Sequence, residues 1–309
     1  MIERRGLLRF AVLSVVAAFV TIGLKGAAYA VTGSIGLLSD ALESLANLIA
    51  ALVALFALSV AARPADEEHA YGHTKAEYFS SGFEGLLIAV AAVGIVVAAV
   101  RRFMEPQPIT EPALGLAANA VASAVNFAVA RVLLRVGRRH DSITLEADAQ
   151  HLMADVWTSV GVIAGVGAAV ATGWHRLDAI IAMLVALNVL RSGFRLLDRS
   201  MHGLLDTSLP EETLVTIKGI LDHHAGAGVR YHALRTRQAA ARRFISVHIL
   251  VPGDWTVQRG HDLLETIEER IREAVPRSVV DTHLEPIEDP VSWEDTRLER
   301  PSQGDAPAV

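Results

Sequence analysis

Polar side chains spaced four residues apart interrupt two apolar stretches of this sequence. Glu43 and Asn47 lie in LLSDALESLANLIAALVAL, and His151 and Asp155 lie in EADAQHLMADVWTSVGV. Residues four apart share one face of a helix, so each pair can point at one target. Three oxygens and one imidazole nitrogen are a ligand set that tetrahedral zinc accepts, and imidazole suits transition metals better than magnesium or calcium. These four residues are therefore candidate ligands of one divalent transition-metal ion.

The same ligands could exchange a metal ion for protons. A ligand must lose its proton before it binds a metal ion, and an unperturbed histidine such as His151 titrates close to physiological pH. This competition is a ready mechanism for antiport. The alternative is that the polar pairs only form hydrogen bonds between helices. A charge at the centre of a membrane helix costs about 2.5–3.5 kcal/mol, so several such groups require a compensating role.

Two further acids, Asp40 and Asp148, precede the polar pairs by about one helical turn. We expect both at the membrane interface in contact with water. An accessory role at the metal site is the alternative.

The composition indicates that these polar groups lie in a membrane domain. Hydrophobic residues make up 52% of the chain and charged residues 20%, and the mean hydropathy is +0.37. The apolar residues are mostly small, which suits helices that pack closely in lipid. A membrane-spanning helix needs about 20 mostly apolar residues. Six stretches meet this requirement, at 8–31, 36–61, 79–101, 112–137, 145–171 and 177–198.

The charge distribution and the absence of cysteine exclude several classes of function. Basic residues are concentrated before the first span, in the second and fourth loops and after the sixth span, which predicts that both termini are cytoplasmic. The net charge of −6 provides no basic surface for nucleic acid. Because there are no cysteines, any metal must be held by nitrogen and oxygen. The absence of a Walker glycine loop leaves an ion gradient as the energy source.

Beyond residue 205 the pattern is that of a small soluble α/β domain, residues 206–290, with the order αββαβ. Ser208 and Glu211 predict a capping box that opens a helix ending near His224. The other predicted elements are strands at Val229–Gln238 and Arg242–Val251, a helix at Thr256–Ala274 and a strand at Val279–Glu285. Residues 291–309 are polar, with Pro and Gly, and predict a disordered tail.

Histidines and acids outside the membrane spans form two further candidate sets. Asp66, His69 and His73 offer a carboxylate and two imidazoles in the second loop, a weak metal signal when taken alone. In the soluble domain, strand alternation turns His248 away from the apolar face, and His283 and Glu285 share one face.

Taken together, these motifs resemble those of the cation diffusion facilitator family, most closely its bacterial zinc and iron efflux pumps, over residues 8–288. HLMAD, from His151 to Asp155, matches the family's HxxxD on the fifth span. On the second span the family usually has DxxxD or HxxxD, whereas Glu43 and Asn47 stand here. This departure keeps oxygen ligands but lowers the negative charge of the site.

The resemblance implies an α-helical membrane protein of six transmembrane helices followed by a small cytoplasmic α/β (αββαβ, ferredoxin/metallochaperone-like) domain. It implies a homodimer in the bacterial inner membrane that exports divalent transition-metal cations, zinc first, in exchange for protons, without an organic cofactor. The chain would be a secondary transporter rather than an enzyme, and no HExxH-like motif of a metal hydrolase is present. A membrane metal sensor or scaffold that uses only the cytoplasmic domain is the alternative.

The family also supplies expectations for other residues. It implies a loop metal site at Asp66, His69 and His73, and an ionic lock between Lys75 and Asp206. It implies metal sites near the dimer contact formed by a further set of five residues, in which Glu285 stands where relatives more often have Asp. This set is His232, His248, His261, His283 and Glu285.

Overall fold

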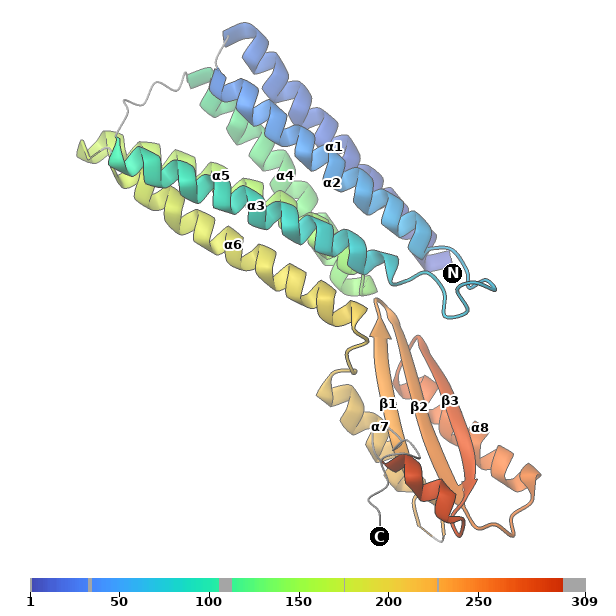
Figure 1. The fold of residues 1–309 in the computed structure, drawn as a ribbon. Coiled ribbons are helices and arrows are strands. Elements are labelled where there is room, and N and C mark those ends of the chain that lie inside the picture. The colour runs from blue at the N-terminus through green and yellow to red at the C-terminus, as the bar shows by residue number, and fades with distance from the viewer. Residues whose placement is uncertain (1, 33–34, 106–112, 175, 227, 297–309) are drawn as a thin grey trace. The chain divides into compact units, whose positions relative to one another are not determined.

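Long runs of small and branched apolar residues fold into helices in the first part of the chain (Figure 1). The computed structural model describes residues 2–32, 35–105, 113–174, 176–226 and 228–296 and divides into two compact units, residues 1–204 and 205–309. The helices of the first unit are α1 (Ile2–Thr32), α2 (Ile35–Ala61), α3 (Ala76–Met104), α4 (Ala113–His140), α5 (Ile143–Thr172) and α6 (Arg176–Leu204).

Small residues set how closely these helices approach. α1 packs against α2 and α4, α4 against α5, and α3 against α6. At the contact between α3 and α6, a Cβ atom on Gly85 would lie 3.1 Å from the carbonyl oxygen of Gly193. A Cβ atom on Gly193 would lie 3.0 Å from the carbonyl oxygen of Gly85. The two backbones therefore touch, as in other membrane helix pairs with small residues at the interface.

The distribution of polar and apolar side chains in the first unit is that of a membrane protein. Large apolar side chains point outward, and Phe56, Phe79 and Leu184 are each more than 60% exposed, whereas acids such as Glu77 and Glu84 are fully buried. In the described part of the chain, four helices are long and apolar enough to span a membrane, and Asn47–Ala61 is a shorter apolar segment. The prediction of a helical membrane domain is confirmed.

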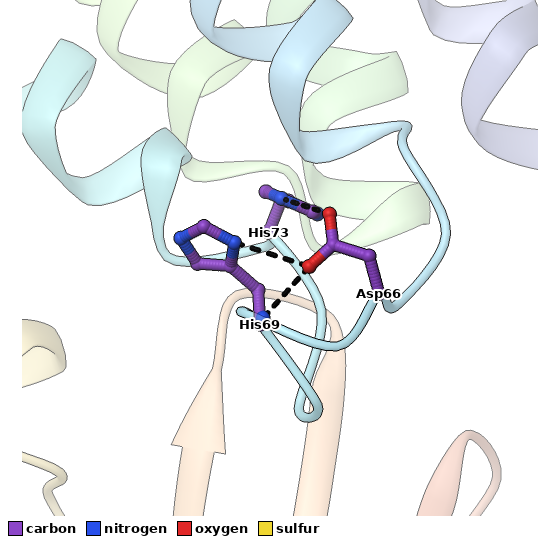
Figure 2. Close-up of side chains that lie close together, drawn as sticks. All are labelled: Asp66, His69 and His73. Carbon is purple, nitrogen blue, oxygen red and sulfur yellow. Dashed lines mark hydrogen bonds and ion pairs between the residues drawn. The ribbon is translucent and has the colours of Figure 1, made fainter.

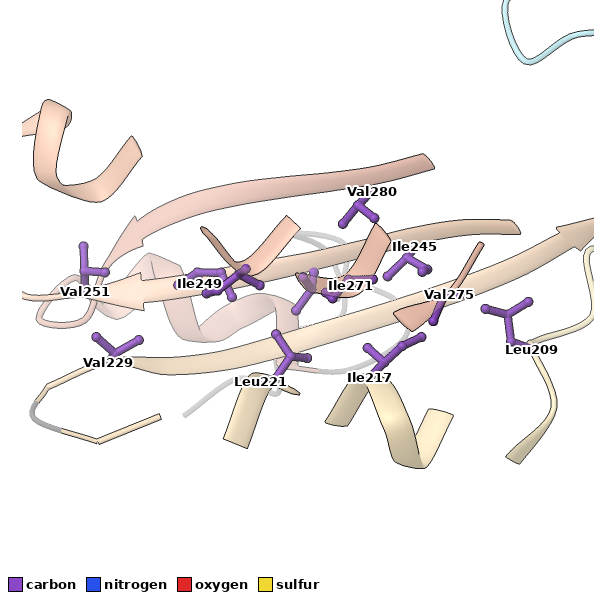
Figure 3. Packing of buried hydrophobic residues seen from close by; sticks show 12 residues of the cluster. Leu209, Ile217, Leu221, Val229, Ile245, Ile249, Val251, Ile271, Val275 and Val280 are labelled. Carbon is purple, nitrogen blue, oxygen red and sulfur yellow. The ribbon is translucent and has the colours of Figure 1, made fainter. Parts of the chain in front are cut away.

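The second unit is a three-stranded sheet with two helices on one face. Its elements are α7 (Glu211–His224), β1 (Arg230–Ala239), β2 (Arg242–Val251), α8 (Val257–Ala274) and β3 (Ser278–Pro286). The strand order is β1-β2-β3, with β1 antiparallel and β3 parallel to β2. Ile245 and Ile249 of the sheet pack against Ile217 of α7 and Ile271 of α8 (Figure 3). The predicted αββαβ domain is confirmed.

Two local predictions in this unit need correction. The capping box is wrong, because Pro210 occupies the N-cap position of α7 and the hydroxyl of Ser208, two residues earlier, lies 2.8 Å from that of Thr236 on β1. The start of the expected tail forms a 3-10 helix, η1 (Pro290–Thr296), which packs against β1. Residues 297–309 lie outside the described part of the chain.

Candidate metal sites

α2 and α5 bring three of the four predicted membrane ligands together. The Oδ1 atom of Asn47 accepts a hydrogen bond from Nε2 of His151 at 2.8 Å, and its Nδ2 donates to Oδ2 of Asp155. Asn47 and His151 are 5% and 6% exposed. Because an amide oxygen can only accept, Nε2 of His151 carries a proton. Its Nδ1 is buried and has no hydrogen-bond partner among the described residues.

The network has an additional member that the sequence analysis did not assign. Asn126 of α4 donates a hydrogen bond from Nδ2 to Oδ2 of Asp155 at 3.4 Å, and its own Oδ1 is buried without a partner in the described structure. Nothing in its sequence context distinguished Asn126 from Asn119, which accepts a hydrogen bond from Ser159 instead.

The remaining acids near the polar pairs behave differently from each other. Asp40 and Glu43 lie in α2, but their side chains fall outside the described ones. Asp148 is 1% exposed and accepts a hydrogen bond from Ser14 of α1 at 2.9 Å. The prediction that Asp148 contacts water is therefore wrong, because this part of α5 is enclosed by neighbouring helices.

The loop between α2 and α3 holds the second predicted set as a compact cluster (Figure 2). Oδ1 of Asp66 accepts from the backbone N–H of His69 at 2.7 Å and lies 3.2 Å from Nδ1 of the same residue. The hydrogen bond from this backbone N–H lowers the pKa of the Asp66 carboxyl, which favours its ionised form. Nδ1 of His73 donates to the carbonyl of Pro64 at 3.2 Å, and its Nε2 faces Oδ2 of Asp66 at 3.3 Å. A cation or a proton between these facing atoms would stabilise the arrangement.

The third cluster is a row of imidazoles across the sheet of the second unit. His232 pairs with His248, and His248 pairs with His283, in the register of the three strands. Neighbouring imidazole rings lie 5.1 and 5.0 Å apart. The carboxylate of Glu285 joins the row: Oε2 lies 2.8 Å from Nε2 of His232, and Oε1 lies 3.2 Å from Nδ1 of His248 and 3.6 Å from Nε2 of His283.

A β-bulge in β1 is what places His232 in this row. Arg235 pairs with Ser246 but His232 pairs with His248, so two residues of β1 oppose Val247. Ala233, at the bulge, has a φ of 51°. A regular ladder would instead pair Ala233 with His248 and turn His232 to the helix-covered face.

His261 does not join the row within one chain. It is exposed on α8, which packs on the opposite face of the sheet through Ile267 and Ile271. Trp293 of η1 lies beside the row instead, with its ring 6.2 Å from that of His232.

The predicted ionic lock joins residues of the two units, which are described separately, and it stays a prediction. Within the first unit, Nζ of Lys75 donates to the carbonyl of Leu204 at the end of α6, at 3.4 Å. Within the second unit, Asp206 accepts from Arg237 at 3.2 Å.

Comparison with known proteins agrees with this arrangement of a helical membrane unit followed by a small α/β unit. Residues 11–205 match the family model of the cation efflux transmembrane domain, and residues 209–287 match that of the cation efflux protein cytoplasmic domain. The chain is 55% identical to an uncharacterised transporter, sll1263, of Synechocystis sp., over 92% of each chain. It is 29% identical to the cation-efflux pump FieF of Citrobacter koseri, over 90% of this chain and 92% of the relative.

A solved chain of the candidate zinc transporter CzrB is 33% identical; the match covers 25% of this chain and 96% of the solved one, with a TM-score of 0.24. The two family models cover most of the sequence in the order of the two structural units. The protein therefore belongs to the cation diffusion facilitator family of cation efflux transporters.

Proposed function

We propose that this protein exports divalent transition-metal ions, zinc first among them, from the cytoplasm in exchange for protons. The observation that carries the proposal is the meeting of Asn47, His151 and Asp155 between α2 and α5. We include Glu43 as a fourth ligand because it precedes Asn47 by four residues on α2. Imidazole together with carboxylate and amide oxygens favours zinc or iron over magnesium and calcium.

In this proposal the metal-free ligands satisfy one another and the cargo ion replaces those contacts. The amide of Asn47 bridges His151 and Asp155. A divalent ion that binds all three side chains breaks both hydrogen bonds and displaces any proton bound to them. Movement of α2 and α5 relative to the rest of the bundle would then open the site to the other side of the membrane, as in other secondary transporters that bind their cargo near the midplane.

We propose that the chain works as a homodimer in the bacterial inner membrane with both termini in the cytoplasm. The family model that matches residues 209–287 is named for a dimer. Six membrane crossings place both ends on one side, and the basic residues of the loops favour the cytoplasm. The loop cluster at Asp66 and the imidazole row with Glu285 would bind further metal ions, the row as a regulatory site near the dimer contact.

Transport of zinc into inverted membrane vesicles tests this function. A pH gradient, acidic inside the vesicle, should accelerate zinc uptake by the wild type, and Asp155→Ala should abolish it. Asp198→Ala is the matched control, because the Asp198 side chain is 74% exposed near the end of α6. A rate of zinc uptake that does not depend on the pH gradient would contradict the proposed antiport. Full transport activity of Asp155→Ala would contradict the proposed metal site.

The alternative of a sensor or scaffold gives the opposite result. It requires that Asn47, His151 and Asp155 can all be replaced by alanine without an effect on metal tolerance. Growth of a bacterial strain lacking its own exporters, on zinc, iron, cobalt, manganese and cadmium in turn, tests this alternative and identifies the exported ion.

A further inference from the structure

Two carboxyl groups are buried in the helical bundle apart from the candidate metal ligands. Glu84 of α3 is 0% exposed and Asp148 of α5 is 1% exposed. At this level α5 packs against Ala11 and Ala17 of α1 on one side and against Ile88 of α3 on another. α3 and α5 pack against each other here: Ile88, one turn after Glu84, lies in the same buried cluster as Ala147, the sequence neighbour of Asp148.

Each of these carboxyl groups has one satisfied oxygen and one that is not. Ser14 of α1 donates to Oδ1 of Asp148 at 2.9 Å, and Ser80 of α3 donates to Oε1 of Glu84 at 3.4 Å. Oδ2 of Asp148 and Oε2 of Glu84 are buried and have no hydrogen-bond partner among the described residues. A buried oxygen of this kind normally has a partner.

The surrounding helices provide no cation for the pair in the described part of the bundle. On α5, the neighbouring Glu146 is bound by Arg199 of α6 at 2.6 Å, and His151 is bound by Asn47 of α2. The other titratable and charged groups near this level point to other partners. On α3, Glu77 accepts from Ser142 at 2.6 Å, and α6 presents Gly193 and Leu197 to Gly85. On α1, Lys25 lies eleven residues beyond Ser14, which is about 16 Å along a helix.

Two neighbouring carboxylates buried without a cation cannot both remain charged at an acceptable free energy. A proton on one carboxyl group removes the repulsion and gives the unpartnered oxygens a hydrogen-bond donor. Because Asp148 lies one turn before His151 on α5, any movement of α5 that serves the metal ligands also moves Asp148 relative to Glu84.

We propose that Glu84 and Asp148 form a proton-binding site that is separate from the metal ligands and carries a proton of the exchange. This inference rests on the proposed antiport. The pair holds a proton while the metal ligands are bound to one another, and it releases that proton when α5 moves with a bound cation.

Flux measurements on the full-length protein in proteoliposomes test the proposal. Glu84→Gln and Asp148→Asn keep the shape of each side chain but cannot exchange a proton. Both variants should bind zinc with wild-type affinity by isothermal titration calorimetry. Proton movement per zinc ion, followed with an entrapped pH-sensitive dye, should be lower in both variants than in the wild type. Ser14→Ala, which keeps both carboxyl groups, should remain coupled.

Infrared difference spectra keep the proposal testable if a variant is unstable. Zinc added to the wild type should remove a band of protonated carboxyl groups, and Glu84→Gln should lack that band. Wild-type proton movement per zinc in both variants would overturn the proposal. Loss of zinc binding in both, or a wild-type spectrum without the band, would do the same. Wild-type zinc flux that carries no protons would reject the antiport as well.

Discussion

Asn47 is the described candidate membrane ligand whose side chain cannot ionise. Its amide accepts from His151 and donates to Asp155, so it links the two other described ligands without adding a charge. A carboxyl group at the same position could make both contacts only if it or Asp155 carried an additional proton. The amide therefore reduces the dependence of the metal-free network on protons.

Asn47→Asp should bind zinc more tightly than the wild type at neutral pH. A unit charge about 4 Å from another contributes about 4 kcal/mol at an effective dielectric constant of 20, and repulsion from Asp155 offsets part of this gain. Calorimetric titration at several pH values should show a lower Kd and a steeper pH dependence. Asn119→Asp is the control, because Asn119 is bonded to Ser159 rather than to the ligands. An unchanged Kd for Asn47→Asp would argue that residue 47 does not face the ion.

Tyr231 should make the folding stability of the second unit decrease at alkaline pH. Burial and the hydrogen bond that its hydroxyl donates to Asp222 at 2.7 Å raise the pKa of Tyr231 from 10.0 to about 12. Because the pKa is higher in the folded state, the neutral phenol stabilises the fold below pH 10, and this contribution is lost as the pH rises through 12.

Urea unfolding as a function of pH should therefore show a decline in stability between pH 10 and 12 that is smaller in Tyr231→Phe. At neutral pH the variant should lose roughly 1 kcal/mol or less, the usual contribution of one partly exposed hydrogen bond. Identical pH profiles for the wild type and the variant would contradict this role of Tyr231.

At the scale of elements, the β-bulge in β1 determines the position of the candidate metal ligand His232. Ala233 adopts a φ of 51°, a left-handed conformation that costs a branched side chain roughly 1–2 kcal/mol. Ala233→Val should weaken zinc binding by the imidazole row, whereas Ala233→Gly, which relieves the strain, should keep it. Zinc titrations of both variants, with circular dichroism to verify folding, would decide this. Equal zinc affinity in the two variants would show that the bulge does not position His232.

The contact between α3 and α6 should also respond to a single added side chain. Gly85→Val places Cβ within 3.1 Å of the backbone of α6, whereas Gly94→Val on the same helix meets no atom within 4 Å. Overpacking of this kind costs typically 1–3 kcal/mol. Thermal unfolding in detergent should give a lower Tm for Gly85→Val than for Gly94→Val, and equal Tm values would contradict the close approach.

Apolar length and strand alternation predicted these elements well, but contacts between elements depend on information that one sequence does not contain. Alternation turned His248 away from the core, yet the place of His232 in the row follows from a bulge that no local pattern indicated. Hydropathy located Asp148 in the fifth apolar stretch but did not indicate that neighbouring helices enclose it. Asn126 and Asn119 look alike in sequence and both contact α5, but the partner of Asn126 is Asp155 and that of Asn119 is Ser159.

At the scale of the whole molecule, the second unit has a core that does not depend on metal. Ile217, Ile245, Ile249 and Ile271 pack between the sheet and its helices, whereas the imidazole row lies on the other face. A chelator should therefore leave this unit folded, in contrast to a zinc finger.

Zinc should raise the Tm of the second unit by mass action. Removal of zinc should return the Tm to that of the folded metal-free protein without loss of secondary structure in circular dichroism spectra. His232→Ala should abolish most of the zinc-dependent rise, and His223→Ala, an exposed histidine on α7, should preserve it. Unfolding on addition of a chelator would show instead that the metal ion is part of the core.

The backbone contact between Gly85 of α3 and Gly193 of α6 limits how these two helices can move relative to each other. Helices that touch without side chains between them have little freedom to rotate past each other, so α3 and α6 should travel as one rigid body. Asn47, His151 and Asp155 lie on α2 and α5, outside this rigid pair, whereas Glu84 lies on α3 and belongs to it. A displacement of α3 and α6 by a few ångströms relative to α2 and α5 would therefore separate Glu84 from Asp148, while the candidate metal ligands keep their mutual geometry.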